Sequence, residues 1–348
     1  MSVEALDPAA AAAARTRIDA LTKPVGSLGR IEALAVHLCA IAGRVIDRAY
    51  EKKAILVGAA DHGVAREGVS AYPAEVTPQM VGAFLAGHAA ISAFARTARA
   101  DVFVANFGVD ADFAPHPLLI EVPLGRGTAN LARGPAMDIA TVHRAFAAGE
   151  TALDFILAGN AYDVVALGDM GIANTTSAAA ITAACCNVSA EAVTGRGTGI
   201  DDGHLLRKRE VVARAIEQLG GSSWETIAAA IGGFEIVGLA GAIVRAASLR
   251  LPVVLDGFIV SAAALLAQRI EPRSIDYCIA AHRSQEPGHR IALEFLALEP
   301  LLDLNLRLGE GSGAALALPL IEAATRMIAE MKTFAEAGVA TADDARTS

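Results

Sequence analysis

Lys53-Ala54-Ile55-Leu56-Val57-Gly58-Ala59-Ala60-Asp61-His62-Gly63 is the stretch of sequence that decides the fold. Lys53 is followed by seven apolar residues, and this pattern over 53–60 is typical of a strand buried in a parallel sheet. Polar residues follow the run directly, so the strand places polar groups at its carboxyl end. Ligands bind at that end of the strands in open parallel sheets. The stretch therefore predicts an α/β fold with a ligand-binding edge.

The same succession of a strand, a polar glycine loop and a helix recurs about six times along the chain. One helix is expected from Thr77 to about Arg96, and another from Asp138 to about Ala158. This pattern predicts a parallel, Rossmann-like sheet flanked by helices. Further strands are expected at 101–106, 118–122, 163–167, 252–257 and 276–281.

Both ends of the chain lie outside this alternation. Helices are expected over Pro8 to Ala20, over roughly 30–43, and after Gly311. We expect residues 1–45 and 311–348 to pair as a small helical subdomain. Residues 46–310 would then form the large α/β domain that contains the active site.

Composition excludes several classes of protein. The formal net charge of -9 argues against a nucleic-acid binder, because phosphate backbones require a basic face. The chain opens without a leader pattern, and none of its charge-free runs is apolar enough to span a bilayer, so we expect a cytoplasmic protein. The four cysteines lack C-x-x-C spacing, which predicts reduced thiols and no metal site.

Leu308-Gly309-Glu310-Gly311-Ser312-Gly313-Ala314 surrounds one carboxylate with three glycines. An apolar helical pattern follows, so Glu310 is expected in a loop at a helix start. Bare backbone N–H groups there would attract an anion, and Glu310 would add a proton acceptor beside them. The alternative is that Glu310 only caps the helix and the glycines only form a turn.

Gly168-Asp169-Met170-Gly171-Ile172-Ala173-Asn174-Thr175-Thr176 follows the expected strand at 163–167. Its last three residues are all of the helix-capping type, although one cap residue is enough for a helix. Three hydroxyl or amide side chains beside glycine backbone form a cradle for a phosphate or a carboxylate. The pattern favours a ligand site over a simple cap.

A metal-dependent hydrolase is an alternative, although the scattered spacing of its candidate ligands argues against it. Those ligands would be Asp61, His62, Asp201, Asp202, His282 and His289.

Six motifs together resemble the nicotinate-nucleotide:dimethylbenzimidazole phosphoribosyltransferases of cobalamin lower-ligand synthesis, in order along nearly the whole chain. They are K-P-x-G-S-L-G-R at 23–30, A-D-H-G-V at 60–64, G-D-M-G-I-A-N-T-T at 168–176, G-R-G-T-G-I-D-D at 195–202, L-D-G-F at 255–258 and L-G-E-G-S-G-A at 308–314. The resemblance implies transfer of ribose 5-phosphate from nicotinate mononucleotide to 5,6-dimethylbenzimidazole. The products would be nicotinate and α-ribazole 5′-phosphate, with inversion at C1′ and without a metal or redox cofactor.

The resemblance also implies roles for individual residues. Glu310 would be the general base, and Asp169 would lie near the ribose and the reaction centre. The remaining substrate contacts fall into three groups: Gly171, Asn174, Thr175 and Thr176 for the nucleotide; Lys208 and Ser284 for the phosphate, with the backbone of the loop around Gly197; and Tyr72, Met80, Met170 and Leu308 for the benzimidazole.

Three positions depart from the family pattern. A glutamate is expected where this chain has Asp169, which leaves a non-catalytic nucleotide-binding relative as an alternative. Tyr72 and Met80 stand at acceptor-pocket positions where some relatives have smaller or polar residues. The acceptor could therefore be dimethylbenzimidazole, unsubstituted benzimidazole, adenine or a phenol. The family implies a homodimer, and the Ala/Gly-rich helices at 224–269 are the expected interface.

Overall fold

The computed structural model describes residues 2–197 and 199–340. A parallel sheet of six strands in the order β3-β2-β1-β4-β5-β6 forms its centre, so the predicted α/β fold with a Rossmann-like sheet is confirmed. The chain runs outward from β1 in one direction and returns to start β4 on its other side. Ligands bind at such a switch point between adjacent strands. The strands are β1 (Lys53–Ala60), β2 (Ala100–Gly108), β3 (Leu119–Glu121), β4 (Val164–Met170), β5 (Val253–Leu255) and β6 (Cys278–Ala280).

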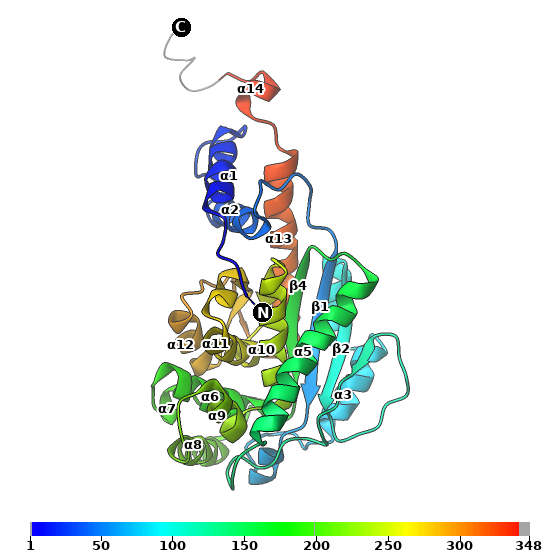
Figure 1. Cartoon of the computed structure of the whole chain (residues 1–348), viewed down its shortest axis with the longest axis vertical. Helices are drawn as coiled ribbons and strands as arrows, with labels where there is room; N and C mark the ends of the chain where they lie inside the picture. Colours follow the sequence, from blue (N-terminus) through cyan, green and yellow to red (C-terminus); the bar gives the residue numbers. More distant parts are fainter. Residues whose placement is uncertain (1, 198, 341–348) are drawn as a thin grey trace.

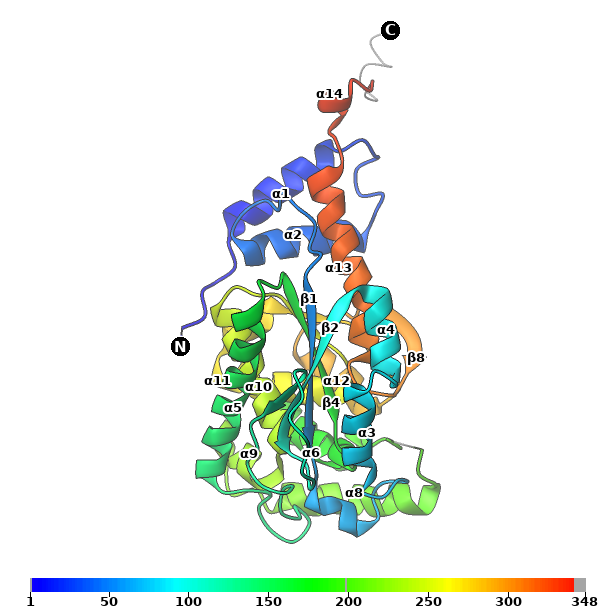
Figure 2. The same ribbon diagram turned by 90° about the vertical axis from the view of Figure 1, so that its right-hand side faces the viewer.

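Strand β1 is buried along its whole length and contributes to a separate core on each face of the sheet. Leu56 and Ala60 belong to one core, and Ile55 and Val57 to the other, as the period of two in a strand requires. Helices cover both faces, as Figure 2 shows with the sheet seen along its edge. One face carries α5 (Ile139–Gly159), α6 (Asn174–Cys186), α9 (Trp224–Ile231), α10 (Phe234–Ser248) and α11 (Phe258–Ile270), and the other α2 (Arg30–Ala42), α3 (Val76–Leu85), α4 (Ala90–Ala98) and α13 (Ser312–Glu330).

Small residues let two of these helices touch backbone to backbone. A Cβ atom at Gly149 of α5 would lie 1.6 Å from the carbonyl oxygen of Gly238 in α10, so only glycine fits there. Most residues of α10 and α11 are buried inside the chain. The helices at 224–269 that we expected at a dimer interface are thus largely used within one chain.

The two terminal segments meet at one end of the molecule, where α1 (Pro8–Ala20) and α2 lie beside α13 (Figure 1). Arg17 donates from Nε to the carbonyl oxygen of Ile328 at 2.8 Å, and Leu21 bridges to Thr333. Helix α13 also reaches the main sheet, because Ala314 and Leu318 belong to its core. The subdomain of 1–45 and 311–348 stays a prediction, and residues 341–348 lie outside the described part.

Helix α13 is also the one helix in the described ranges that is long and apolar enough to span a membrane. In the structure 67% of that apolar window is buried inside the protein, as expected for a core helix.

The single helix expected from Thr77 to Arg96 is wrong, because the chain forms α3 and α4 with a break between them. Gly87 adopts a φ of +75° at the break, a conformation that stops a helix. Glu75, not Thr77, stands at the N-cap of α3. The break creates a second helix start at Ala90, and this start is part of the candidate site.

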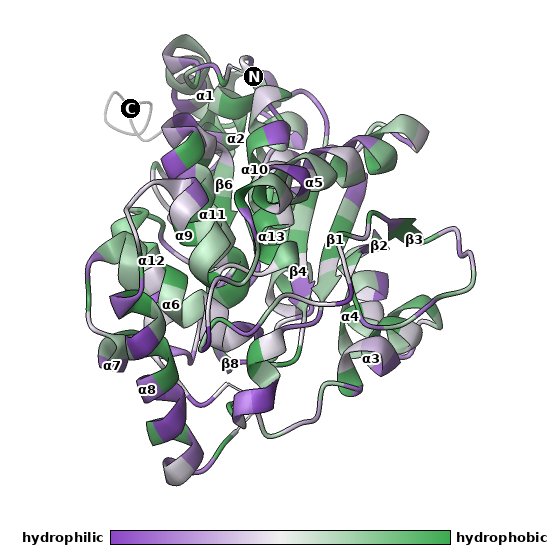
Figure 3. Ribbon diagram, turned by 60° about the horizontal axis from the view of Figure 1, so that its bottom comes forward, coloured by the Kyte–Doolittle hydropathy of each residue, from purple (hydrophilic) through white to green (hydrophobic). Residues whose placement is uncertain are grey.

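The remaining elements surround the carboxyl edge of the sheet and the chain ends. Figure 3 shows that the strands and the helices on them are mostly hydrophobic, whereas α8 alternates in character along its length. These elements are α7 (Ala190–Val193), α8 (Asp202–Glu217), α12 (Pro287–Phe295), α14 (Phe334–Ala337), the 3₁₀ helices η1 (Gly63–Glu67) and η2 (Pro272–Tyr277), and the paired strands β7 (His282–Ser284) and β8 (Leu302–Leu306).

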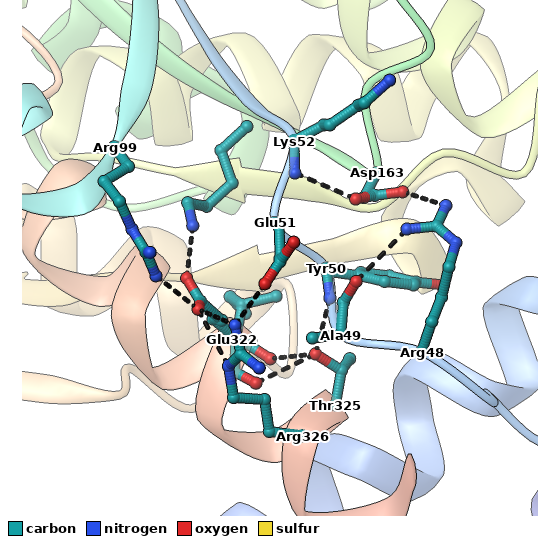
Figure 4. A network of polar contacts seen from close by, with 12 residues as sticks. Arg48, Ala49, Tyr50, Glu51, Lys52, Arg99, Asp163, Glu322, Thr325 and Arg326 are labelled. Atoms are coloured by element: carbon teal, nitrogen blue, oxygen red, sulfur yellow. Dashed lines mark hydrogen bonds and ion pairs between the residues drawn. The ribbon is translucent and has the colours of Figure 1, made fainter. Parts of the chain in front are cut away.

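A buried ion pair fixes α13 to the start of β1. Lys53 Nζ lies 2.5 Å from Glu322 Oε2, and the Lys53 side chain is fully buried. Arg99 and Arg326 bind the other carboxylate oxygen at 2.6 Å and 2.9 Å (Figure 4). Burial alone would raise the pKa of Glu322, but hydrogen bonds from Lys53 and Arg326 lower it to about 2.

Replacing Glu322 by Gln should destabilise the protein by about 3–5 kcal/mol at pH 7, because Lys53 would stay buried without its counter-charge. The lowered pKa means that this contribution is complete above the ordinary value of 4.5 and is lost as the pH falls towards 2. Urea unfolding between pH 7 and pH 3 measures both effects. Glu330→Gln is the control, since Glu330 is exposed and also binds Arg326. Equal stability of the two variants at pH 7 would contradict this assignment.

Candidate functional site

A cavity of about 380 Å³ opens at the carboxyl ends of the strands, at the switch point between β1 and β4. Residues from six separate segments line it, from the loop before α3 to the loop before α13. The structure thereby brings together most of the residues that the sequence resemblance singled out. They are Tyr72, Met80, Asp169, Met170, Gly171, Asn174, Thr175, Gly197, Ser284, Leu308 and Glu310.

Two of the expected residues, Lys208 and Thr176, lie behind the wall and do not line the cavity. Both are fully buried. Lys208 Nζ donates to Thr175 Oγ1 at 2.7 Å, so the lysine reaches the wall through a residue that lines the cavity. Burial lowers the pKa of Lys208 to about 8, while the nearby Glu286 carboxylate raises it in part.

The three cap-type residues after β4 do not cap α6. The cap position is Ala173, whose φ of +73° turns the chain into the helix without a side-chain bond. Asn174 Nδ2 donates instead to Asp169 Oδ2 at 3.0 Å, and Thr175 accepts from Lys208. Asn174 and Thr175 line the cavity, whereas Thr176 does not. The ligand site that the sequence pattern favoured here stays a prediction.

Glu310 lies in a strained loop that crosses β4 at close range. Gly309, Glu310 and Gly311 have φ angles of +85°, +65° and +88°, a region that non-glycine residues rarely adopt. A Cβ atom at Gly168 would lie 2.4 Å from the backbone nitrogen of Gly311. The Glu310 N–H donates to the carbonyl oxygen of Asp169 at 3.2 Å. The crossing thus holds both carboxylate residues at one wall of the cavity.

The Glu310 carboxylate does not cap α13, so the alternative that it serves only as a cap for its own helix is wrong. Its Oε2 atom accepts from the N–H of Ile91 at 3.4 Å, at the start of α4. The residue is only 6% exposed. Burial raises the pKa of Glu310, and the bond from Ile91 opposes this in part.

The N–H groups at the start of α13 are not bare, which corrects our expectation of an anion site there. Asp256, which follows β5, accepts from Gly311 N at 3.1 Å and from Ala314 N at 2.9 Å. Burial raises the pKa of Asp256 to about 7, although these backbone bonds lower it in part. Asp256 was expected as an acid at the end of the strand at 252–257 and within the L-D-G-F motif, but its helix partner is 55 residues away.

Asp169 is buried and has one oxygen without a hydrogen-bond partner. Asn174 binds Oδ2, whereas Oδ1 is unpaired within the described protein. Burial raises the pKa of Asp169 well above its ordinary value, and the charge of Asp256 adds to the effect. A buried carboxyl oxygen in a cavity wall that still needs a partner is suited to bind a ligand hydroxyl or a cationic centre.

Other residues of the wall were not expected from the sequence. Glu286 Oε1 accepts from Gly197 N at 2.8 Å and so fixes the glycine loop. His282 is buried, and burial lowers its pKa to about 4, so the imidazole is neutral at pH 7. The polar run after the strand at 276–281 was the sequence signal for both residues, and it does not tell which side chains turn inward. His282 was expected only as a metal ligand of the hydrolase alternative. The further unexpected residues are Val76, Ile172, Gly257, Phe258, Ile259, Arg307 and Gly309.

The candidate metal ligands of the hydrolase alternative are scattered. His62 binds Glu235 at 2.7 Å with both side chains fully buried, and Asp201 binds His204 at the start of α8. Within residues 2–197 and 199–340, no three His, Cys, Asp or Glu side chains form a group that could hold a metal ion. The arrangement gives the hydrolase alternative no support.

Comparison with known proteins shows the family of this chain. The sequence profile of a family described as "Phosphoribosyltransferase" matches residues 3–339. The nicotinate-nucleotide–dimethylbenzimidazole phosphoribosyltransferase of Chloroflexus aurantiacus is 51% identical over 96% of this chain and 95% of its own length. The protein of that name from Thermus thermophilus is 50% identical over 96% of this chain and 99% of its own length.

A crystal structure of the Thermus thermophilus enzyme superimposes on the present structure with a TM-score of 0.92. The match covers 97% of this chain and all of the other, at 49% identity. Neither the sequence nor the fold of this chain leaves a large segment without a counterpart. The chain belongs to the phosphoribosyltransferase family of these nicotinate-nucleotide–dimethylbenzimidazole enzymes.

Proposed function

We propose that this protein transfers the ribose 5-phosphate group of nicotinate mononucleotide to 5,6-dimethylbenzimidazole. The names of the relatives, at about half identity over nearly full length, support the choice of substrates. The observation that carries the proposal is the buried Glu310 carboxylate at the cavity wall, held by one backbone N–H. A carboxylate so placed is available to take a proton from a bound base.

The reaction balances without a cofactor. A ring nitrogen of the benzimidazole attacks C1′ of the ribose, and the bond from C1′ to the nicotinate nitrogen breaks with its electron pair. Nicotinate leaves readily because its ring nitrogen is cationic in the substrate. The benzimidazole N–H proton passes to Glu310, which keeps positive charge from building up on the acceptor. Attack from the face opposite the nicotinate inverts C1′ and gives α-ribazole 5′-phosphate.

Burial of Glu310 suits it to this role. Because burial raises the pKa of the carboxyl group, the ionised form is a stronger base than an exposed glutamate. Asp169 lies on the same wall, and its unpaired oxygen would bind a ribose hydroxyl or support the positive charge at C1′. Its side chain is one methylene shorter than the expected glutamate. The non-catalytic alternative rests on this difference.

The phosphate would bind at the wall formed by Thr175, Ser284 and Gly197. Lys208 stands behind it as a buried cation that donates to Thr175 Oγ1, with the Glu286 carboxylate nearby. A substrate phosphate at this wall would supply a further negative partner for the lysine. The benzimidazole would lie at the other end of the cavity, where Tyr72 and Leu308 are half exposed at the mouth.

We further propose that the protein is a cytoplasmic homodimer. All four cysteines are free, as expected in a reducing compartment. The dimer rests on the resemblance alone, and its interface would have to use surface other than the buried faces of α10 and α11.

Replacing Glu310 by Gln should lower turnover by about 10²–10⁴-fold in EDTA-containing buffer, because the benzimidazole proton loses its acceptor. Nicotinate release, followed by chromatography, measures the effect. Unchanged circular dichroism would show that folding is intact.

Glu299→Gln is the control, since Glu299 is exposed and pairs with Arg30. Full activity of the Glu310→Gln variant would refute the role of the base. Binding of nicotinate mononucleotide without nicotinate release in the wild type would favour the non-catalytic alternative.

Replacing Lys208 by Met should raise the KM for nicotinate mononucleotide by about 10–100-fold, the equivalent of one charged hydrogen bond. The KM for the base should change little. Steady-state kinetics with each substrate varied in turn measures both values. Arg209→Met is the matched control, because it removes a neighbouring cation on α8 that pairs with Glu191. An unchanged KM in the Lys208 variant would argue against a phosphate site at this wall.

The acceptor pocket should discriminate between dimethylbenzimidazole and benzimidazole by about 10–200-fold in kcat/KM for each of the two methyl groups at most, since one methyl group in an apolar pocket contributes only about 1–3 kcal/mol. Nicotinate release with a panel of benzimidazole, adenine and phenol acceptors tests this. The proposal requires dimethylbenzimidazole to rank first. A higher kcat/KM for adenine or a phenol would reassign the acceptor without changing the donor.

A further inference from the structure

The start of α13 depends on a carboxylate from a different part of the chain. Asp256 follows β5 and is 1% exposed. It accepts two backbone hydrogen bonds, one from the N-cap residue Gly311 and one from Ala314 in the first turn. These bonds replace the side-chain cap that α13 lacks at its own N-cap position. The residue immediately before Gly311 is Glu310. Asp256 therefore binds the chain one residue away from the proposed base.

The Glu310 loop has few other restraints on the cavity side. Three consecutive residues have positive φ angles, a conformation that is costly for Glu310 and must be imposed by its surroundings. The carboxylate itself has one hydrogen bond, from Ile91 at 3.4 Å. The carbonyl oxygen of Asp169 accepts from the backbone N–H of Glu310. Within the loop, the Ser312 hydroxyl donates to the carbonyl oxygen of Gly309 at 2.7 Å. The two bonds of Asp256 fix the far side of the loop to the end of β5.

The imidazole ring of His282 packs against the same turn. Its Nδ1 atom lies 3.8 Å from Asp256 Oδ1, and a Cβ atom at Gly313 would lie 2.0 Å from that nitrogen. The first turn of α13 thus packs so closely against the imidazole ring that no side chain fits at position 313. Because the ring also lines the cavity, a shift of Asp256 or of the turn would be transmitted to the wall that faces the substrate.

We propose that Asp256 is a positioning residue of the reaction, which holds the Glu310 carboxylate in its reactive place by binding the backbone of Gly311 and Ala314. This inference rests on the proposed function, because it assigns Asp256 a role through the general base. Asp256 does not line the cavity and need not touch the substrate. A displacement of the base of about 1 Å is enough to slow such a reaction by about a hundredfold.

A double-mutant cycle tests the proposal. Asp256→Asn should lower kcat by about 10–100-fold and leave the affinity for nicotinate mononucleotide within about threefold of the wild type. In a Glu310→Gln background the same substitution should cost less than about threefold, because the group that it positions is already absent. Single-turnover nicotinate release with excess enzyme measures the slow variants, and calorimetry measures the affinity.

Asp163→Asn is the matched control. Asp163 is also a buried aspartate that accepts a backbone N–H, from Lys52 at 3.0 Å, but it stands at the opposite end of β4. Its substitution should lower stability and leave kcat unchanged. Asp256→Glu is the second variant, since it keeps a carboxylate but shifts the turn, and it should show the same lack of additivity.

Equal losses from Asp256→Asn in both backgrounds would overturn the proposal. So would a loss of nucleotide affinity that accounts for the lost rate, or a failure of both Asp256 variants to fold. A wild-type protein that releases no nicotinate with any acceptor would instead refute the proposed function, so the two failures are distinguishable.

Discussion

The backbone contact between Gly168 and the loop Gly309–Gly311 is the constraint on which the candidate site depends. A Cβ atom at position 168 would collide with this loop, so the end of β4 and the start of α13 can approach each other only through glycine. The contact places Asp169 and Glu310 in one wall although 141 positions separate them in the sequence. The strand supplies a rigid base, and the loop supplies a carboxylate in a conformation that needs such support.

Ionisable side chains are buried at and around the cavity. Asp169, Asp256 and Glu310 are all buried, and burial raises the pKa of each. Backbone N–H groups and an amide, not lysine or arginine side chains, are their hydrogen-bond partners. Of the two basic residues near the cavity, Arg307 lines it and Lys208 lies behind Thr175. Negative charge near the proposed sugar and base and positive charge near the proposed phosphate match the charges that the reaction would develop. At the opposite end of β1, Lys53 and Glu322 form a fully compensated pair with a structural role.

The sequence was sufficient to predict the fold, because apolar runs such as 54–60 recur in alternation with polar glycine loops and helical patterns, as in a parallel sheet flanked by helices. It was also sufficient to select most of the cavity-lining residues, through the resemblance of its motifs to the family. It did not predict the break between α3 and α4, since the apolar pattern of the helix continues across Gly87. That break creates the start of α4 at which Glu310 is bound. Asp256, Glu286 and His282 were also missed as partners in the site, because their contacts join segments that are distant in the sequence and no local pattern encodes such a pairing.

The central claim is that the protein transfers ribose 5-phosphate from nicotinate to an aromatic base within this cavity. The most direct measurement is the identity and amount of the products formed from nicotinate mononucleotide and dimethylbenzimidazole, determined by mass spectrometry and by proton NMR at C1′. The account predicts one ribazole 5′-phosphate in the α configuration for each nicotinate released. Free ribose 5-phosphate in place of that product, or a ribazole with retained β configuration, would contradict it.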